Sequence, residues 1–378
     1  MQAPLLELGA FAELCSQTLK ASAYPLAHRV EKNVLLYDSD EIRSGLSSAS
    51  FQQALKQELA HVLQQGSGVF VLQNAFADQA VIARMNEVFE AIFVQEADKA
   101  SGDHFAKAGA NGRIWNALQK SALIDPAAFV EYYKNPLLLL ASEAWLGPHY
   151  QMTTQVNVVR PGGQAQAPHR DYHLGFQEQN ELARYPLHTH LMSTQLTLQG
   201  AVAHTDMPLE SGPTLLLPFS QQYALGYFAW RDPAFKAYFD EHAIQLALKQ
   251  GDALFFNPAL FHAAGNNYTQ DFHRSANLLQ VSSAFGRSME QIDRYAMTHA
   301  FYPALQKEWA HLNEWERDAV LSSACEGYSF PTNLDSDPPL SGLAPQTMKQ
   351  LTAQALQDGL AVETFKQQLQ QHAQQRLA

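Results

Sequence analysis

Hydrophobic side chains recur at helical spacing in the first part of the chain. Between residues 50 and 64, and again between 78 and 93, apolar residues return every three or four positions, which predicts two amphipathic helices. A short β-type run at 69–72 follows the glycines at 66 and 68. Residues 1–149 are therefore expected to be mostly helical.

Residues 150–285 have a different pattern. Short runs rich in β-branched and apolar residues alternate with Pro, Gly and Asn, which predicts a β core. The expected strands cover residues 152–159, 190–203, 214–218, 253–256 and 275–283. Residues 229–242 predict a helical insert, because Pro233 can occupy a first helical turn and aromatic residues then follow at helical spacing.

The chain becomes helical again from residue 286. A linker rich in Pro, Ser and Asp covers 331–345, and Val362, Phe365 and Leu369 then form an apolar stripe among glutamines, which is typical of a docked helix. We expect one domain over 1–378. It has a mostly helical part at 1–149, a β core at 150–285 and a helical extension at 286–378.

Composition and charge exclude several classes of partner. The chain has 25 basic and 37 acidic residues, a formal net charge of −12, and no two adjacent Lys or Arg residues, so a nucleic-acid partner is not expected. Apolar runs are short and the first residues lack a basic segment, so neither a membrane span nor a secretion signal is expected. The only cysteines, Cys15 and Cys325, have no metal-binding or disulfide spacing and favour a reducing, cytoplasmic setting. The pattern leaves the oligomeric state open.

Three residues have the side chains and the order of a metal site. His169 and Asp171 lie two positions apart, so on an extended segment both side chains point to one face. His262 comes later, in a turn that follows the strand at 253–256. Two histidines and one carboxylate bind one face of iron(II) and leave the opposite side open for a chelating cosubstrate and oxygen.

Other polar residues of the β core could bind that cosubstrate. Arg274 opens the strand after His262, and a buried guanidinium there could form a fork with the far carboxylate of a dicarboxylate. Gln155 and Asn157 are polar residues inside an otherwise apolar strand, so they could hydrogen-bond the cosubstrate or pair with neighbouring loops.

The surrounding motifs occur in a recognisable order. They are Arg160-Pro-Gly-Gly before His169-Arg-Asp171, then Glu210-Ser-Gly-Pro-Thr-Leu-Leu-Leu-Pro218-Phe-Ser220, then Gly251-Asp-Ala-Leu-Phe-Phe before His262-Ala-Ala-Gly-Asn-Asn. This order resembles the phytanoyl-CoA dioxygenase family of iron(II)- and 2-oxoglutarate-dependent oxygenases, over about residues 68–285. The resemblance implies a double-stranded β-helix, that is a cupin-like jelly roll, with helical N- and C-terminal extensions.

The resemblance also implies roles for individual residues. His169, Asp171 and His262 would hold Fe(II), and Arg274 would anchor 2-oxoglutarate. One motif departs from the family, because the stretch that usually reads Pro-Gly-Ser-His is Pro218-Phe-Ser-Gln221 here. The glycine turn and the histidine are therefore not expected from the sequence.

Other histidines offer alternative ligands. His204 and Asp206 repeat the His-x-Asp spacing, but starting from them removes the expected strand at 190–203 from the interval before His262, so His169 and Asp171 are favoured. His188 and His190 are interpreted as ordinary polar residues near a strand start. His173 could face the site or lie outside it.

A loop ahead of the β core is a candidate lid. Residues 101–115 are rich in Gly and Ala and carry Lys107, Arg113 and Trp115, so we expect this segment to cover the metal site with Arg113 or Trp115 reaching inward.

The function predicted from these residues is an Fe(II)- and 2-oxoglutarate-dependent dioxygenase that hydroxylates a small-molecule substrate and releases succinate and CO2. Halogenation is disfavoured, because a halide would need the position that Asp171 occupies. The acidic composition disfavours an acyl-CoA substrate, although Lys107 and Arg113 could form a local basic pocket. Two alternatives remain, namely a cupin-like metalloenzyme that does not use 2-oxoglutarate and a non-enzymatic ligand-binding module.

Overall fold

The computed structural model describes residues 4–96, 111–164, 166–331, 333–339 and 342–377. Its centre is a sheet of eight strands in the order β1-β2-β3-β8-β6-β10-β5-β4. Strands β2 and β3 are parallel, and the other neighbours are antiparallel. The strands are β1 (Arg29–Glu31), β2 (Val34–Asp38), β3 (Val69–Gln73), β4 (Asn111–Ile114), β5 (Gln151–Val159), β6 (Thr197–Ala203), β8 (Ala253–Phe256) and β10 (Arg274–Ser282).

A small second sheet lies against one face of the large one. It consists of β7 (Leu215–Leu216) and β9 (His262–Ala263). Residue His169 adds a single antiparallel bridge to His262 on β9. The two sheets form the expected double-stranded β-helix, and helices extend it at both ends, so the predicted fold class is confirmed.

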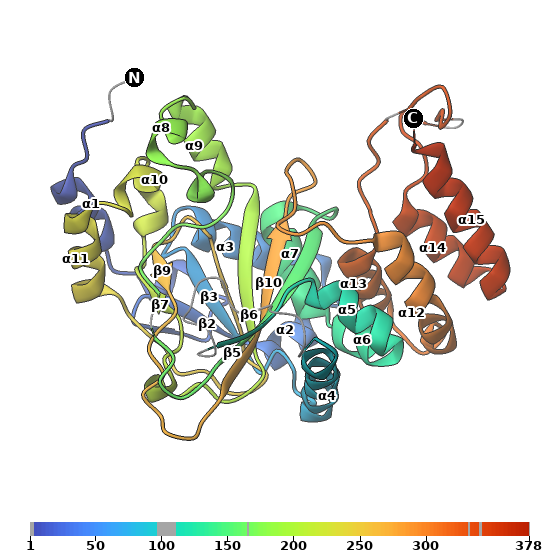
Figure 1. Cartoon of the computed structure of the whole chain (residues 1–378), viewed down its shortest axis with the longest axis horizontal. Coiled ribbons are helices and arrows are strands. Elements are labelled where there is room, and N and C mark those ends of the chain that lie inside the picture. The colour runs from blue at the N-terminus through green and yellow to red at the C-terminus, as the bar shows by residue number, and fades with distance from the viewer. Residues whose placement is uncertain (1–3, 97–110, 165, 332, 340–341, 378) are drawn as a thin grey trace.

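Helices flank this core on several sides (Figure 1). Those before β5 are α1 (Leu8–Cys15), α2 (Ser39–Gly45), α3 (Ala49–Gln64), α4 (Gln79–Gln95), α5 (Ala117–Ile124), α6 (Pro126–Tyr133) and α7 (Pro136–Leu146). Those between β5 and β8 are α8 (Gln179–Leu182), α9 (Leu187–Ser193), α10 (Gly226–Ala229) and α11 (Pro233–His242). The last four are α12 (Arg294–Glu308), α13 (Glu314–Ala324), α14 (Met348–Gln357) and α15 (Val362–Gln375), which lie away from β7 and β9 in Figure 1.

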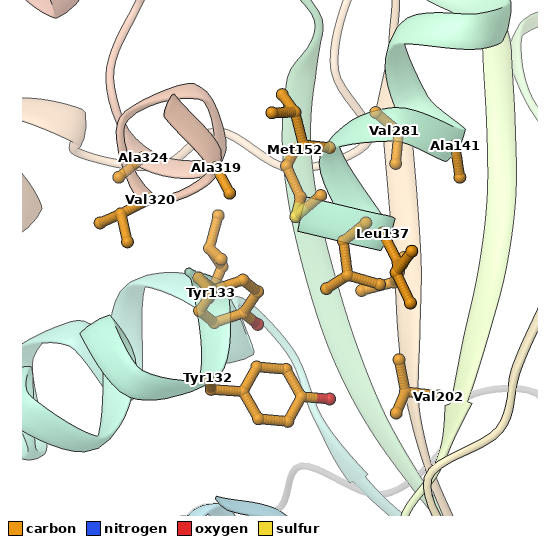
Figure 2. Close-up of a cluster of buried hydrophobic side chains, with 14 of the residues drawn as sticks. Tyr132, Tyr133, Leu137, Ala141, Met152, Val202, Val281, Ala319, Val320 and Ala324 are labelled. Carbon is orange, nitrogen blue, oxygen red and sulfur yellow. The ribbon is translucent and has the colours of Figure 1, made fainter. Parts of the chain in front are cut away.

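One face of the large sheet carries the main hydrophobic core. Helices α3, α5, α7 and α13 contact strands of the sheet. Figure 2 shows Tyr132 and Tyr133 of α6, Leu137 and Ala141 of α7 and residues of α13 packed against Met152, Val202 and Val281 of the strands. The opposite face carries a smaller cluster that includes Val69, Val71, Leu254 and Phe256. Successive residues of a strand point to opposite faces, so strands such as β3 and β8 contribute to both clusters.

Local signals explain where several helices begin. The side chain of Asp78 accepts a hydrogen bond from the Ala80 amide at the start of α4, and Asn135 does the same for Leu137 just ahead of Pro136 in α7. Helices α13 and α14 both begin with a reciprocal capping box. In α15 Phe365 and Leu369 are buried and Val362 is partly buried against the core, so this helix is docked as predicted.

Two sequence predictions differ from the structure. The strand expected at 190–203 begins only at Thr197, because residues 187–193 form α9 and the buried His190 ring stacks on Phe228. Residues 1–149 are mostly helical, and the run expected at 69–72 is β3, but this part of the chain also supplies β1, β2 and β4 of the large sheet, which were not expected. Strand β2 is a nearly fully buried apolar run without alternation, which sequence periodicity does not distinguish from helix.

None of the helices in the described part of the chain combines the length and the apolar character that a transmembrane span requires.

Candidate active site

The small sheet brings the three candidate ligands together. The backbone amide of His169 donates to the carbonyl of His262 at 3.1 Å, and that of His262 donates back at 3.3 Å. The backbone amide of Asp171 donates to the Pro258 carbonyl at 3.1 Å, so the chain at Asp171 is held beside the segment that leads to His262. Ligands that lie 91 residues apart in sequence therefore sit on adjacent extended segments.

Their side chains converge on one point. Nε2 of His169 lies 3.5 Å from Oδ1 of Asp171, and Nε2 of His262 lies 3.3 Å from Oδ2 of the same carboxylate. One ligand atom from each of the three residues lies within 4.8 Å of the others. Side-chain exposure is 24% for His169, 20% for Asp171 and 7% for His262, so the group opens to one side.

Backbone carbonyls set the orientation of both rings. Nδ1 of His169 is 2.9 Å from the Ala167 oxygen, and Nδ1 of His262 is 2.8 Å from the Leu260 oxygen. A carbonyl can only accept, so Nδ1 carries a hydrogen in each ring, and Nε2 is the nitrogen directed at Asp171. Histidines that bind metals commonly donate their other ring nitrogen in this way. The donor set fits a divalent transition metal ion with open positions.

The electrostatics of the group favour metal-binding protonation states. Burial opposes ionisation of Asp171, but His169 and His262 hold the pKa of its carboxyl well below the usual range. Burial and the charge of His169 lower the pKa of His262, which keeps that ring neutral. Burial also favours neutral His169, yet the Asp171 carboxylate raises its pKa, so a metal ion would displace a proton there.

A chain of polar side chains holds the Asp171 carboxylate from behind. Nε2 of Gln199 on β6 donates to Oδ2 of Asp171 at 2.5 Å and lies 3.4 Å from Oε1 of Gln280 on β10. The Tyr172 hydroxyl donates to the same Gln280 oxygen. Sequence reasoning missed these glutamines. Their polar character within buried strand segments was the available signal, the same one that singled out Gln155 and Asn157.

Arg170 is a second residue that sequence reasoning missed. Its side chain is 1% exposed, and its Nη2 donates to the carbonyls of Ser220 at 2.7 Å and Tyr223 at 3.0 Å. The guanidinium lies against Gly226, where a Cβ atom would overlap it. Arg170 thus ties the segment between His169 and Asp171 to the loop after β7.

That loop keeps a left-handed turn without the glycine of the family motif. Phe219 has φ 70° and ψ −11°, and its amide donates to the Ser67 carbonyl at 2.9 Å. Gln221, in place of the family histidine, donates to the Gly66 carbonyl at 2.9 Å. The loop therefore attaches to the segment before β3, and buried contacts maintain a conformation that L residues rarely adopt.

The ligand group opens into a cavity of about 440 Å³. Its floor is one face of the large sheet, formed by alternate residues of β8, β6, β10, β5 and β4. Arg274 lines the same cavity at the start of β10 and is 6% exposed. Burial lowers the pKa of Arg274 to about 10, which leaves it charged near neutral pH. Its Nη1 donates to the Gly212 carbonyl.

Gln155 and Asn157 also line this cavity, as side chains of β5. Gln155 is 2% exposed and accepts a hydrogen bond from Nη1 of Arg113 at 3.0 Å. Asn157 is 8% exposed, and its Oδ1 receives no hydrogen bond from the described residues. The structure therefore places both residues where they can reach a ligand in the cavity.

The alternative histidines lie elsewhere. His204 is fully buried on the helix side of the sheet, where its Nε2 is 2.8 Å from the Tyr132 hydroxyl and its Nδ1 is 2.6 Å from Oδ1 of Asn86. His188 is exposed, and His190 is buried against Phe228.

His173 does not line the cavity, and its Nδ1 is 3.4 Å from the Ser193 hydroxyl. His28, Asp38 and Glu41 form another group of possible ligands, but it is largely exposed and lies outside the cavity.

The candidate lid falls partly outside the described residues. This applies to Lys107 and to residues 101–110 as a whole. The following residues form strand β4 rather than a loop, because they pair with β5. Arg113 and Trp115 line the cavity.

Comparison with known proteins agrees with this site. Residues 65–276, more than half of the chain, match the family described as phytanoyl-CoA dioxygenase (PhyH). The chain belongs to the phytanoyl-CoA dioxygenase family. The description of this family names a dioxygenase.

Individual relatives are more distant. The dioxygenase trt7 of Aspergillus terreus (strain NIH 2624 / FGSC A1156) is 27% identical over 139 residues, which cover 37% of this chain and 43% of that protein. The match therefore spans less than half of that protein's length.

Two solved structures with similarity at low TM-scores are the epimerase SnoN with Fe3+, alpha ketoglutarate and nogalamycin RO, and HygX from Streptomyces hygroscopicus with nickel and 2-oxoglutarate. SnoN has a TM-score of 0.43 and 15% identity, covering 61% of this chain and 85% of its own. HygX has a TM-score of 0.39 and 13% identity, and the match covers 63% of this chain and 91% of the HygX chain.

Proposed function

We propose that this family member hydroxylates a small molecule bound in the cavity, with iron held by His169, Asp171 and His262 and with 2-oxoglutarate anchored by Arg274. The observation that supports this best is the convergence of two Nε2 atoms and one carboxylate on a cavity that also contains a buried arginine. When bound, the iron would supply oxygen activation coupled to decarboxylation of 2-oxoglutarate to succinate and CO2.

The residues of the chain would prepare this chemistry. Asp171 stays ionised and His262 neutral, so both present lone pairs without losing a proton first. Nδ1 of each histidine keeps its hydrogen and donates it to the Ala167 or the Leu260 carbonyl, which holds the ring in place.

Arg274 would bind the distal carboxylate of 2-oxoglutarate. A guanidinium matches a carboxylate in a planar fork, and the pair is strong where water is excluded. The same cavity is lined by Leu246, Leu248 and Leu254, which are buried and apolar. Asn157 and Gln155 would orient the other end of the cosubstrate by hydrogen bonds.

A metal and cosubstrate titration tests this function. Purified protein with iron(II), 2-oxoglutarate and oxygen should form succinate, and Asp171→Ala should reduce succinate to the level without enzyme. Asp206→Ala is the matched control, since Asp206 belongs to the other His-x-Asp pair and should leave succinate formation unchanged. Equal loss in both variants, or full activity of Asp171→Ala, would exclude the proposed ligand set.

A second pair of measurements separates cosubstrate binding from metal binding. Arg274→Gln should weaken 2-oxoglutarate binding by about 30-fold or more, since loss of one partner of a buried charged pair commonly costs ~2 to 5 kcal/mol. Metal affinity of this variant, measured without 2-oxoglutarate, should remain that of the wild type. Oxygen consumption that needs iron but not 2-oxoglutarate would favour the cupin-like alternative.

We also propose that the chain works as one domain in the cytoplasm. The large sheet takes strands from residues 29–38, 69–73, 111–114 and the β core, which supports a single cooperative unit. Cys15 and Cys325 are both free thiols, which supports a reducing compartment.

A further inference from the structure

A buried arginine lies between two of the candidate metal ligands. Arg170 separates His169 from Asp171 in the sequence, and its side chain is 1% exposed. Successive side chains of an extended segment point to opposite sides, so Arg170 points away from the side on which His169 and Asp171 meet His262. The guanidinium therefore lies behind the ligand group and is not one of its ligands.

Neutral groups surround the Arg170 guanidinium. Its Nη2 donates to the carbonyls of Ser220 at 2.7 Å and Tyr223 at 3.0 Å, and its Cζ lies 5.2 Å from the centre of the Tyr227 ring and 5.4 Å from that of Phe261. None of the ion pairs within the described part of the chain includes Arg170. Burying a charge without an opposite charge costs free energy, and a long apolar side chain would fill this space at less cost. The guanidinium is therefore expected to contribute more than packing.

Arg170 contacts both of the segments that carry the ligands. Phe261, against which the guanidinium lies, directly precedes His262 in the sequence. Ser220 strengthens this connection, because its carbonyl accepts the hydrogen bond from Arg170 and its hydroxyl accepts one from the Phe261 amide at 2.8 Å. The segment of the first two ligands is therefore linked to the segment of the third by side chains on the side away from the metal site.

This link matters because the backbone ladder at the site is short. Strands β7 and β9 have two residues each, and His169 joins β9 through a single bridge. Metal ligands must be held within a fraction of an ångström of their working positions, and so short a ladder restrains the two segments weakly. The contacts of Arg170 supply a restraint that the ladder lacks.

Gly226 shows how closely the guanidinium is fitted. It is the first residue of α10, and a Cβ atom there would overlap Cζ, Nη1 and Nη2 of Arg170, which are the three atoms nearest to it. Because the backbone at Gly226 is helical, an alanine would be allowed there apart from this overlap. A methyl group at this position would therefore displace the guanidinium first.

We propose that Arg170 is a positioning residue, which holds the His169–Asp171 segment and the His262 segment at the spacing that metal binding requires. This inference rests on the ligand set of the proposed function. Arg170 acts from behind, through Ser220 and Phe261, and differs in this from Gln199, which contacts the Asp171 carboxylate itself. Loss of the guanidinium lets the two segments shift, so that metal affinity and coordination geometry change in a protein that is still folded.

Cobalt(II) is the probe for the first test, because its visible absorption reports the arrangement of its ligands. Calorimetry and absorption titrations of the purified protein measure affinity and geometry. Arg170→Met keeps a long side chain in the buried space but removes both hydrogen bonds, so it should weaken cobalt(II) binding by about 10- to 100-fold and change the absorption bands. A folded Arg170→Met protein with wild-type affinity and spectrum would overturn the proposal.

Arg294 provides a matched control. It lies at the start of α12, outside the cavity, and its guanidinium also donates to backbone carbonyls, those of Met152, Ser323 and Ala324. Arg294→Met should lower the melting temperature and leave the cobalt(II) affinity and spectrum unchanged. Equal loss of affinity in Arg170→Met and Arg294→Met would indicate general destabilisation and would contradict a specific role of Arg170.

The conservative variant separates positioning from packing. Arg170→Lys keeps a cation that can donate to the same carbonyls but lacks the planar guanidinium, so it should recover part of the cobalt(II) affinity that Arg170→Met loses. A lysine variant that binds cobalt(II) no better than the methionine variant would contradict a role of these hydrogen bonds.

A second approach leaves Arg170 in the chain and displaces it. Gly226→Ala should also weaken cobalt(II) binding, and it decides the question if Arg170→Met does not fold. In the double variant the new methyl group enters the space that the guanidinium has left, so binding should be no weaker than in Arg170→Met alone. Unchanged affinity in Gly226→Ala, or losses that multiply in the double variant, would contradict the proposal.

Two further proteins distinguish this proposal from the proposed function. The wild type should bind cobalt(II), and Asp171→Ala should bind it weakly. A wild type that does not bind cobalt(II), or an Asp171→Ala protein that binds it equally well, would contradict the ligand set itself. Where both behave as expected, unchanged binding in Arg170→Met and Gly226→Ala would overturn only the role of Arg170.

Discussion

Leu278 and Leu279 are neighbours on β10 but serve opposite faces of the large sheet. Leu278 is partly buried and lines the cavity, whereas Leu279 is fully buried in the core beneath the helices. The same alternation separates Phe256 from Phe255 on β8 and Ala276 from Asn277 on β10. One set of strands therefore supplies a packed face for stability and an open face for binding.

Histidines on the two faces differ in how their nitrogens are used. Both ring nitrogens of His204 on the helix face pair with protein groups, Tyr132 and Asn86, and burial lowers its pKa to about 3. His262 on the cavity side gives only Nδ1 to the backbone and directs Nε2 at Asp171. A nitrogen aimed at a shared point in a cavity distinguishes a ligand from a structural histidine.

The largest expected effect tests this difference directly. His262→Ala removes one of three metal ligands and should reduce succinate formation to background, with weak metal binding by calorimetry and little change in the melting temperature. His204→Ala should do the reverse. It leaves Tyr132 and Asn86 without their buried partner, so we expect a loss of about 2 to 4 kcal/mol in the free energy of unfolding with activity per folded molecule retained.

Similar results for the two variants would contradict the distinction between His262 as a metal ligand and His204 as a structural histidine. A His204→Ala protein that is folded but inactive would show that the helix face also takes part in the reaction. Urea unfolding and succinate assays on the same preparations separate these outcomes.

The next test uses the two leucines. Leu279→Ala creates a cavity in the main core and should lower the free energy of unfolding by about 2 to 5 kcal/mol. The matched Leu278→Ala variant should lose less stability, because that side chain is already partly exposed, but should change the affinity for 2-oxoglutarate. Denaturant unfolding measures the stability of both variants, and ligand titration measures their affinity for 2-oxoglutarate. An equal loss of stability would contradict the assignment of Leu279 to the core and Leu278 to the cavity.

Local sequence patterns were sufficient to predict the long helices and strands and to indicate the candidate metal ligands. The helices at 49–64 and 79–95 and the strand at 253–256 agree with their periodicity within two residues, because each has a clear apolar face or a fully buried run. The spacing of His169 and Asp171, the position of His262 after a strand, the number of strands between them and the family resemblance together pointed to the three residues that the fold brings together.

Features set by long-range contacts were not predictable. Strand β4 reads Asn-Gly-Arg-Ile and has no β signal of its own, so only pairing with β5 makes it a strand. Gln199 on β6 contacts both Asp171 and Gln280 on β10, which no local pattern encodes. Phe219 adopts the turn expected of glycine because the loop around it is held by buried hydrogen bonds.

Gln199 offers a smaller effect confined to the cavity face. Gln199→Met keeps the volume but removes the hydrogen bond to Oδ2 of Asp171, so we expect metal affinity to fall by about 10- to 100-fold. Gln199→Glu should not restore it, because a carboxylate would repel Asp171. Thermal unfolding of the metal-free protein is the control, since a merely structural role would lower the melting temperature without changing metal affinity in the folded protein.

The smallest effect concerns pH and Glu290, a neighbour of the cavity residue Gln155. Burial raises the pKa of Glu290 from 4.5 to about 7, although the Asn116 amide at 2.7 Å, Gln155, Lys120 and Arg113 each favour its charged form. The folded state therefore binds more protons than the unfolded state between these values, so Glu290 lowers the free energy of unfolding as pH rises from about 4.5 to 7 and has no further effect above that. Because the side chain is only half-buried, we expect this contribution to be about 1 to 2 kcal/mol, less than the full pKa shift would give.

Glu290→Gln should remove this pH dependence, so the difference in unfolding free energy between variant and wild type should move in favour of the variant from acidic to mildly alkaline pH. Urea unfolding across this range measures the difference, and a constant offset between the two proteins would show that folding does not raise the pKa of Glu290.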